Sequence, residues 1–249
     1  MRYPTSMPLP FDLSAAQAHL SQDEKLSELI SATLQFALDE SAANSPYEAL
    51  MEAIAYQSIS GKAAATIYGR VKALSGTGQP PTPEQMLKLR KPALRKAGLS
   101  GAKVLAMKDL AKKTIEGIVP TREQALTMSD EELVARLVSV RGIGAWTVEM
   151  FLIFNLGRPD VLPIHDLGVK KGWSVAYGKK HMPTPKQLLA FGERWRPYRT
   201  VASWYMWRAF ERAGYAVTNK IRPPRKKRRK PTPKPARHRP HVRAPKSST

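Results

Sequence analysis

The residues best placed to do chemistry lie in one segment, 133–172, which reads LVARLVSVRGIGAWTVEMFLIFNLGRPDVLPIHDLGVKKG. Its apolar residues repeat at helical spacing, stop at the turn RGIG (141–144) and resume near Ala145. Glycines permit such a turn and let a partner approach the main chain closely. Free amides at the start of a helix bind anions, helped by the helix dipole. The segment therefore predicts either a helical hairpin that grips a phosphate group or a purely structural corner.

Two ionisable side chains follow in the loop LPIHDLG (162–168). Asp166 can cap a helix that begins at Leu167, because Asp is favoured at such positions. A carboxylate capped in this way is also held rigidly, as a catalytic group must be. His165 offers a second acid–base group, although a single histidine beside such a loop is more often incidental. The residue types alone leave open a structural and a catalytic role for Asp166.

The elements that must position these groups are helices. A hydroxyl residue followed three positions later by Glu or Gln marks a capping box. The pattern occurs at Ser21/Glu24, Ser45/Glu48, Thr82/Gln85, Thr121/Gln124, Ser129/Glu132 and Thr184/Gln187. Three of these sites also place proline at the first helical position, namely Pro46, Pro83 and Pro185. The sequence shows no alternating strand pattern, residues 161–165 form a predicted loop, and the aromatic segment at 198–213 is predicted to be buried. The body is therefore predicted to be all-α, with about ten helices.

Composition excludes several classes of protein. The 249 residues contain no cysteine, which excludes disulfides, thiolate zinc sites and cysteine-ligated iron–sulfur clusters. No apolar run approaches the roughly 18 residues of a membrane-spanning helix. The first residues, MRYPTSMPLPFDLS, lack the pattern of a secretory signal. We therefore expect a soluble protein that acts inside the cell, in the bacterial cytoplasm or nucleoid, or in the nucleus of a eukaryote.

The charge indicates a polyanionic partner. The formal net charge is +21, and residues 220–249 contain 13 Lys or Arg, seven prolines and no acid. The remaining residues, 1–219, carry 28 basic and 20 acidic side chains. We predict a globular domain over 1–219 and a disordered Lys/Arg/Pro-rich tail over 220–249, because the tail has almost nothing to bury. The tail, with its cluster RKKRRK (225–230), suits either tethering to DNA or targeting.

Taken together, these features resemble the helix-hairpin-helix DNA glycosylase superfamily, and within it the 3-methyladenine DNA glycosylase II type. The resemblance covers roughly residues 12–215. Its most specific parts are RGIGAWT (141–147), LPIHDLG (162–168), YQSIS (56–60) and RWRPYRTVASWYMW (194–207). It implies an all-α fold of two helical subdomains with a helix-hairpin-helix motif and a DNA-binding cleft between them. It also implies an enzyme of base excision repair that flips a damaged base out of double-stranded DNA and hydrolyses its N-glycosidic bond.

The resemblance assigns the catalytic role to Asp166, which would stabilise the oxocarbenium-like transition state. Bifunctional members of the superfamily carry a nucleophilic lysine at the position that matches Trp146. Tryptophan cannot attack the sugar, so the resemblance implies a monofunctional enzyme acting on alkylated purines of the 3-methyladenine and 7-methylguanine type. A bifunctional glycosylase/lyase and a non-catalytic helix-hairpin-helix DNA-binding protein remain as alternatives.

The resemblance also implies the remaining site residues. Aromatic and soft side chains would hold the flipped, cationic base, namely Trp146, Met150 and Trp207. The wedge that fills the vacated stack would be Gln57 and Ser58. Contacts to phosphate would come from Arg141, Gly142, Gly144, Ala145, Thr147 and Lys170. No cofactor is expected to be required, although main-chain oxygens of Val138, Val140 and Ile143 match a site for a structural Na⁺ or K⁺. The protein is expected to act as a monomer without a membrane partner.

Overall fold

The computed structural model describes residues 9–33, 36–38, 43 and 45–214. Within them the chain forms α1 (Leu13–Leu20), α2 (Glu24–Ala32), α3 (Pro46–Tyr56), α4 (Gly61–Ala73), α5 (Pro83–Lys88), α6 (Lys91–Lys96), α7 (Gly101–Ile115), α8 (Arg122–Thr127), α9 (Asp130–Leu137), α10 (Ala145–Phe154), α11 (Leu167–Ala176), α12 (Pro185–Gly192), a 3-10 turn (Glu193–Trp195) and α13 (Arg199–Arg212). These ranges contain no strand, so the predicted all-α class is confirmed. The thirteen α-helices of the described ranges exceed the expected number of about ten, and three of them, α5, α6 and α8, are only six residues long.

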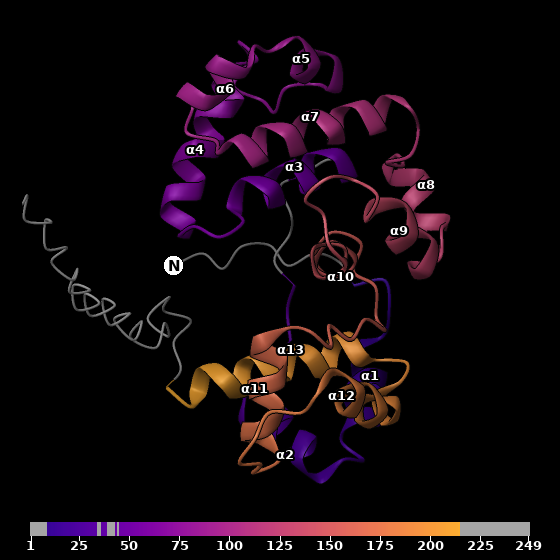
Figure 1. The fold of residues 1–249 in the computed structure, drawn as a ribbon. Coiled ribbons are helices and arrows are strands. Elements are labelled where there is room, and N and C mark those ends of the chain that lie inside the picture. The colour runs from indigo at the N-terminus through magenta and orange to yellow at the C-terminus, as the bar shows by residue number, and fades with distance from the viewer. Residues whose placement is uncertain (1–8, 34–35, 39–42, 44, 215–249) are drawn as a thin grey trace, which may run out of the picture. The chain divides into compact units, whose positions relative to one another are not determined.

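The described helices divide into two groups by their mutual contacts (Figure 1). In one group α7 packs against α3, α5 and α6, and α3 also contacts α4 and α10, which in turn contacts α9. In the other, α13 packs against α11, α2 and α1. The helices at both ends of the described chain therefore belong to the same group. This division matches the two predicted helical subdomains.

The local start signals account for most of the helix boundaries. Reciprocal capping boxes form at Thr82, Thr121 and Thr184. Ser45 and Ser129 also cap their helices through the side-chain oxygen. The predicted box at Ser21 is wrong. Instead, the carboxylate of Asp23 accepts hydrogen bonds from the amides of Lys25 and Leu26 and so begins α2.

Helix α13 is the buried centre of the second group. Thr200 and Val201 through Met206 are buried, and Tyr205 is fully inaccessible. The aromatic segment predicted at 198–213 is therefore a core helix, as expected. Its aromatic contacts extend outward, since Trp204 packs edge-on against both Tyr205 and Phe36. A helix buried on several sides gives its partly exposed residue Trp207 a well-defined position.

Helices α11 and α13 approach each other closely at one glycine. A Cβ atom added to Gly172 would lie 1.8 Å from the carbonyl oxygen of Met206 and 2.5 Å from its carbonyl carbon. Both atoms belong to the main chain of α13, so no side chain can move aside. The absence of a side chain at Gly172 therefore sets the distance between α11 and α13.

We expect Gly172→Ala to lower the free energy of unfolding by about 3 kcal/mol, because the backbones must separate to admit the methyl group. Thermal unfolding should show a melting temperature several degrees below that of the wild type. Gly69→Ala is the matched control, since Gly69 lies within α4 and an added Cβ meets nothing within 4 Å. That variant should gain roughly 0.5–1 kcal/mol. Equal effects of the two substitutions would contradict the close approach.

The predicted tail, residues 220–249, lies outside the described residues, and so does the predicted domain boundary at residue 219. Within the described ranges, no helix is both long and apolar enough to cross a bilayer. The same ranges contain no cluster of three or more His, Asp or Glu side chains arranged to hold a metal ion.

Candidate active site

The predicted helical hairpin is present, formed by α9, the turn at 138–144 and α10. Gly144 is the N-cap of α10, and no side chain caps it. We find no intramolecular acceptor for the amides of Gly144, Ala145 and Trp146 within the described part of the chain. These N–H groups at the positive end of a helix dipole are donors for an anion. The turn thus has the chemistry predicted for it.

Helix α7 and the loop after α3 hold the hairpin turn in place. Asp109 on α7 accepts a hydrogen bond from the backbone amide of Arg141 at 2.7 Å and pairs with Lys113 at 3.1 Å. Lys113 also donates to the carbonyl of Ser139. From the other side, the amide group of Gln57 donates to the carbonyl of Gly142 at 2.9 Å. The hairpin turn and the YQSIS loop therefore form one continuous surface.

Asp166 is the meeting point of three elements. Its Oδ1 caps α11 by accepting from the amide of Val169 at 2.8 Å, so the predicted structural role is confirmed. The same atom accepts from Nε1 of Trp207 on α13 at 2.9 Å. Its Oδ2 accepts from Nε1 of Trp146 on α10 at 2.8 Å. Three N–H donors therefore fix both oxygens of one carboxylate, whereas the neighbouring His165 is exposed and lies outside this network.

An apolar stripe on α10 continues from Trp146. Met150 and Phe154 follow at intervals of four residues, so the three share one face of the helix. Phe154 stacks on Trp207 with ring centroids 5.7 Å apart and an interplanar angle of 25°. Trp146, in contrast, is 47% exposed although it lies on an otherwise apolar helix. Trp146 and Trp207, two of the three predicted pocket residues, thus bind Asp166, and Met150 shares the helix face of Trp146. Phe154 joins this group through its stacking on Trp207, and the same four-residue spacing would have revealed it.

The loop that leads to Asp166 is anchored by charged and hydroxyl groups. Arg158 pairs with Asp130 at 3.3 Å and donates to main-chain carbonyls at the end of α8. Asp160 is bound at 2.6 Å by both Arg196 and Arg199. The buried hydroxyl of Thr200 on α13 binds the loop at two points. It donates to the carbonyl of Arg158 and accepts from the amide of Val161. These bonds attach the loop to α13, the helix that carries Trp207.

Glu149 is a second carboxyl group near Asp166 that we did not identify from the sequence. It lies on α10, three residues after Trp146 and therefore on the same side of the helix. Its Oε2 is buried and has no hydrogen-bond partner among the described residues. Burial, together with the charge of Asp166, raises the pKa of Glu149 to about 7. The signal in the sequence was a lone acid within the apolar run AWTVEMFLIF.

The predicted phosphate-binding residues differ in how far solvent reaches them. Gly142, Gly144 and Ala145 lie in the exposed turn, and the side chain of Arg141 is exposed beside them although its amide is bound to Asp109. Lys170 is partly buried on α11. Thr147, also predicted to contact phosphate, is only 7% exposed, and its amide donates to the carbonyl of Gly144. Thr147 supports the turn from inside.

The predicted wedge residues lie in the loop directly after α3. Gln57 is partly buried and bound to the hairpin turn, as described above. Ser58 is exposed and has a φ of +59°, a left-handed conformation that is uncommon for a residue with a side chain. Ile59, also exposed, extends the apolar surface of the loop. Ser58 and Ile59 are therefore more accessible to a duplex than Gln57.

Two of the three carbonyls suggested for a monovalent cation are available to bind an ion. No hydrogen bond to the carbonyl oxygens of Val138 and Ile143 is found in the described ranges, whereas the carbonyl of Val140 accepts from the amide of Ile143 at 3.0 Å. Carbonyl oxygens of this kind are suitable ligands for Na⁺ or K⁺.

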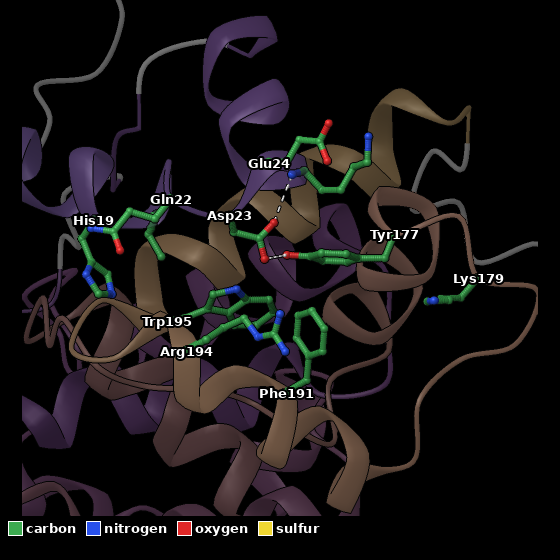
Figure 2. A pocket seen from close by; sticks show the side chains of 11 residues that line it. His19, Gln22, Asp23, Glu24, Tyr177, Lys179, Phe191, Arg194 and Trp195 are labelled. Atoms are coloured by element: carbon green, nitrogen blue, oxygen red, sulfur yellow. Dashed lines mark hydrogen bonds between the residues drawn. The ribbon is translucent and has the colours of Figure 1, made fainter.

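A separate pocket of about 580 Å³ lies at the start of α2 and contains none of the predicted site residues (Figure 2). Nε2 of His19 and Nε1 of Trp195, both in the pocket lining, are buried without a hydrogen-bond partner among the described residues, whereas other polar groups of the pocket are paired. The hydroxyl of Tyr177 donates to Oδ2 of Asp23 at 2.9 Å, and the guanidinium of Arg194 lies 4.0 Å from the centre of the Phe191 ring. Burial and the contact with Asp23 raise the pKa of Tyr177. The bond between Tyr177 and Asp23 joins α11 to the start of α2, and the contact between Arg194 and Phe191 joins the 3-10 turn to α12.

Comparison with known proteins agrees with this geometry. Residues 51–197 match the model of the HhH-GPD superfamily of base excision DNA repair proteins. A DNA-3-methyladenine glycosylase of Schizosaccharomyces pombe is 39% identical over 213 residues, which make up 85% of this chain and 92% of that protein. The solved structure of a 3-methyladenine DNA glycosylase of the same yeast, in complex with abasic DNA, has a TM-score of 0.73 and covers 81% of this chain and 99% of that one. A DNA-3-methyladenine glycosidase structure from Bacillus halodurans has a TM-score of 0.73 at 33% identity, covering 86% of this chain and 94% of that one. The chain belongs to the HhH-GPD superfamily of base excision DNA repair proteins.

Proposed function

We propose that the protein is a monofunctional DNA glycosylase that hydrolyses the N-glycosidic bond of flipped-out alkylated purines of the 3-methyladenine and 7-methylguanine type. The observation that carries the proposal is the carboxylate of Asp166, held at both oxygens by the indole N–H groups of Trp146 and Trp207. A carboxylate fixed among aromatic rings at a loop end suits a reaction that develops positive charge on a sugar. The names of the relatives described above support the same activity.

In this mechanism the bond between the sugar C1′ and the base nitrogen breaks first, and its electron pair leaves with the base. The sugar becomes oxocarbenium-like, and the negative charge of Asp166 stabilises it. A water molecule then adds to C1′ and loses a proton, which leaves an abasic site in an intact strand. An alkylated purine is cationic and so leaves readily, and the stripe of Trp146, Met150 and Phe154 offers it aromatic and sulfur contacts.

The proposal of a monofunctional enzyme rests on Trp146. A lyase reaction needs an amine that forms a Schiff base with the sugar. The indole at this position has no nucleophilic amine, and its N–H is bound to the carboxylate of Asp166. Base release and strand cleavage should therefore be separate events.

DNA is held without sequence readout in this proposal. The free amides of Gly144 and Ala145 bind a phosphate, and Arg141 and Lys170 add positive charge. A monovalent cation at the carbonyls of Val138, Val140 and Ile143 would add a further positive charge at the hairpin. Gln57 and Ser58, with Ile59, fill the space that the flipped base vacates. The protein acts as a monomer wherever damaged double-stranded DNA is present.

The test is a base-release assay on duplex DNA that contains 3-methyladenine or 7-methylguanine. We expect the purified protein to free the base, while strands break only after treatment with alkali. Strand cleavage without alkali, together with a covalent DNA adduct trapped by borohydride, would instead indicate a glycosylase/lyase. Binding to the duplex without release of any base from a panel of lesions would indicate a non-catalytic DNA-binding protein.

A further inference from the structure

The surroundings of Glu149 are unusual for an acidic side chain. Glu149 lies one helical turn after Trp146, whose indole N–H binds Oδ2 of Asp166, and its own Oε2 is buried without a hydrogen-bond partner among the described residues. The charge of Asp166 contributes to the raised pKa of Glu149. Glu149 also lines a pocket of about 390 Å³ between α9, α10 and the loop at 160–162. Apolar walls of this pocket come from Val134, Leu152 and Leu162. A carboxyl group in such surroundings loses hydration, and burial is accordingly the largest cause of its shifted pKa.

The positive charges near this pocket are already paired. Arg199 binds Asp160 at 2.6 Å, and Arg158 pairs with Asp130 at 3.3 Å. The remaining ionisable side chains that line this pocket are acids, namely Asp130 and Glu131 of α9 and Asp160 of the loop. Of the nearby acids, Asp166 at the start of α11 is the one whose charge raises the pKa of Glu149.

Helix α3 also packs against α10, but the charges of its acids Glu48 and Glu52 act on Tyr68 of α4, whose pKa they raise. Within the described residues, therefore, no cation compensates the charge of Glu149.

We propose that Glu149 is a positioning residue that acts through Asp166, because its protonation state decides whether one or two negative charges oppose the cationic sugar. The proposal rests on the glycosylase activity proposed above. With Glu149 protonated, Asp166 alone stabilises the developing charge. When Glu149 loses its proton to solvent, its negative charge adds to that of Asp166. The added charge stabilises the cationic sugar of the transition state but not the neutral sugar of the bound substrate.

The pH dependence of base release distinguishes this role from packing. Release of 3-methyladenine in single turnovers should rise about three- to tenfold between roughly pH 6 and pH 8, with a midpoint near neutrality. Glu149→Gln should remove this rise, and Glu149→Asp should retain it. The matched control is Glu131→Gln, which removes an exposed acid of the same pocket and should leave the profile unchanged. An unchanged profile in Glu149→Gln would overturn the proposal, as would loss of the rise in Glu131→Gln.

Thermal unfolding gives a second readout that does not depend on catalysis. The pKa of Glu149 is raised in the folded protein, so the folded state binds more protons than the unfolded state between about pH 4.5 and about pH 7. The unfolding free energy of the wild type should therefore fall as the pH rises through this window, relative to that of Glu149→Gln. The variant should melt above the wild type at about pH 8 and approach it at about pH 5.

A variant that melts below the wild type by the same amount at both pH values would overturn the proposal, since Glu149 would then be a satisfied structural group. The two failures are distinguishable. If the wild type frees no base, the proposed glycosylase activity fails, while the pH dependence of melting still reports whether Glu149 is a buried acid without a partner.

Discussion

Asp166→Asn should lower the rate of base release at least about 100-fold, while the variant remains folded. The substitution removes the negative charge that opposes the cationic sugar. It also replaces one acceptor oxygen by an amide that cannot accept from an indole N–H. Asn and Asp are nearly equivalent as helix N-caps, so the start of α11 should survive. Single-turnover release of 3-methyladenine and thermal melting measure the two effects separately.

This experiment decides between the two roles of Asp166. If the side chain served only as the cap of α11, Asp166→Asn would release base at nearly the wild-type rate, and that outcome would refute the catalytic assignment. Trp207→Phe is the matched comparison, because it deletes one hydrogen bond to Oδ1 and retains the charge and an aromatic ring. Its loss should be smaller, on the order of tenfold, since one charge-assisted hydrogen bond contributes about 1.5 kcal/mol.

Neutralising the cluster at 225–230 should weaken binding to undamaged duplex DNA about 100-fold at low salt. All six residues of this cluster are Lys or Arg. Each phosphate contact contributes about 0.9 to the slope of log affinity against log salt, so replacing the six by Gln should reduce that slope by up to about five. Titrations between about 50 mM and about 200 mM salt measure both quantities.

The control is a chain whose tail residues are scrambled at constant composition. Electrostatic binding depends on charge and not on order, so this chain should bind as the wild type does. The single-turnover rate on saturating DNA should be unchanged in both variants, because Asp166 and its partners lie outside the tail. If neutralisation leaves affinity and salt slope unaltered, the tail is not a DNA tether, and a targeting role becomes the better interpretation.

The sequence by itself determined the features that depend on local chemistry. A hydroxyl or carboxyl side chain reaches amides two or three residues away, so caps such as Thr82 and Asp166 can be predicted without knowledge of the fold. The hairpin turn is equally local, because glycine conformations and apolar spacing define it. The error at Ser21 has the same local origin, since the neighbouring Asp23 is itself a favoured N-cap residue and accepts from the amides of Lys25 and Leu26.

The catalytic arrangement contains one part that the sequence determined and one that it did not. The family resemblance assigned Asp166 to catalysis and Trp146 and Trp207 to the pocket, but it did not predict that both indole N–H groups bind the carboxylate. Trp207 is 41 residues beyond Asp166, and only the packing of α11 against α13 through Gly172 brings its N–H within 2.9 Å of the carboxylate. Such a contact depends on the distance between two helix axes, which no local pattern encodes.

The tertiary structure alone decided the environment of Glu149 and the accessibility of the DNA-binding residues. An acid in an apolar helix is visible in the sequence, but its pKa depends on which neighbours exclude water and which cations are paired elsewhere. The burial of Thr147 and the bond from Gln57 to the hairpin turn are likewise products of packing. Local hydrogen bonds are set by a few neighbouring residues, whereas burial and electrostatic coupling are properties of the whole assembled core.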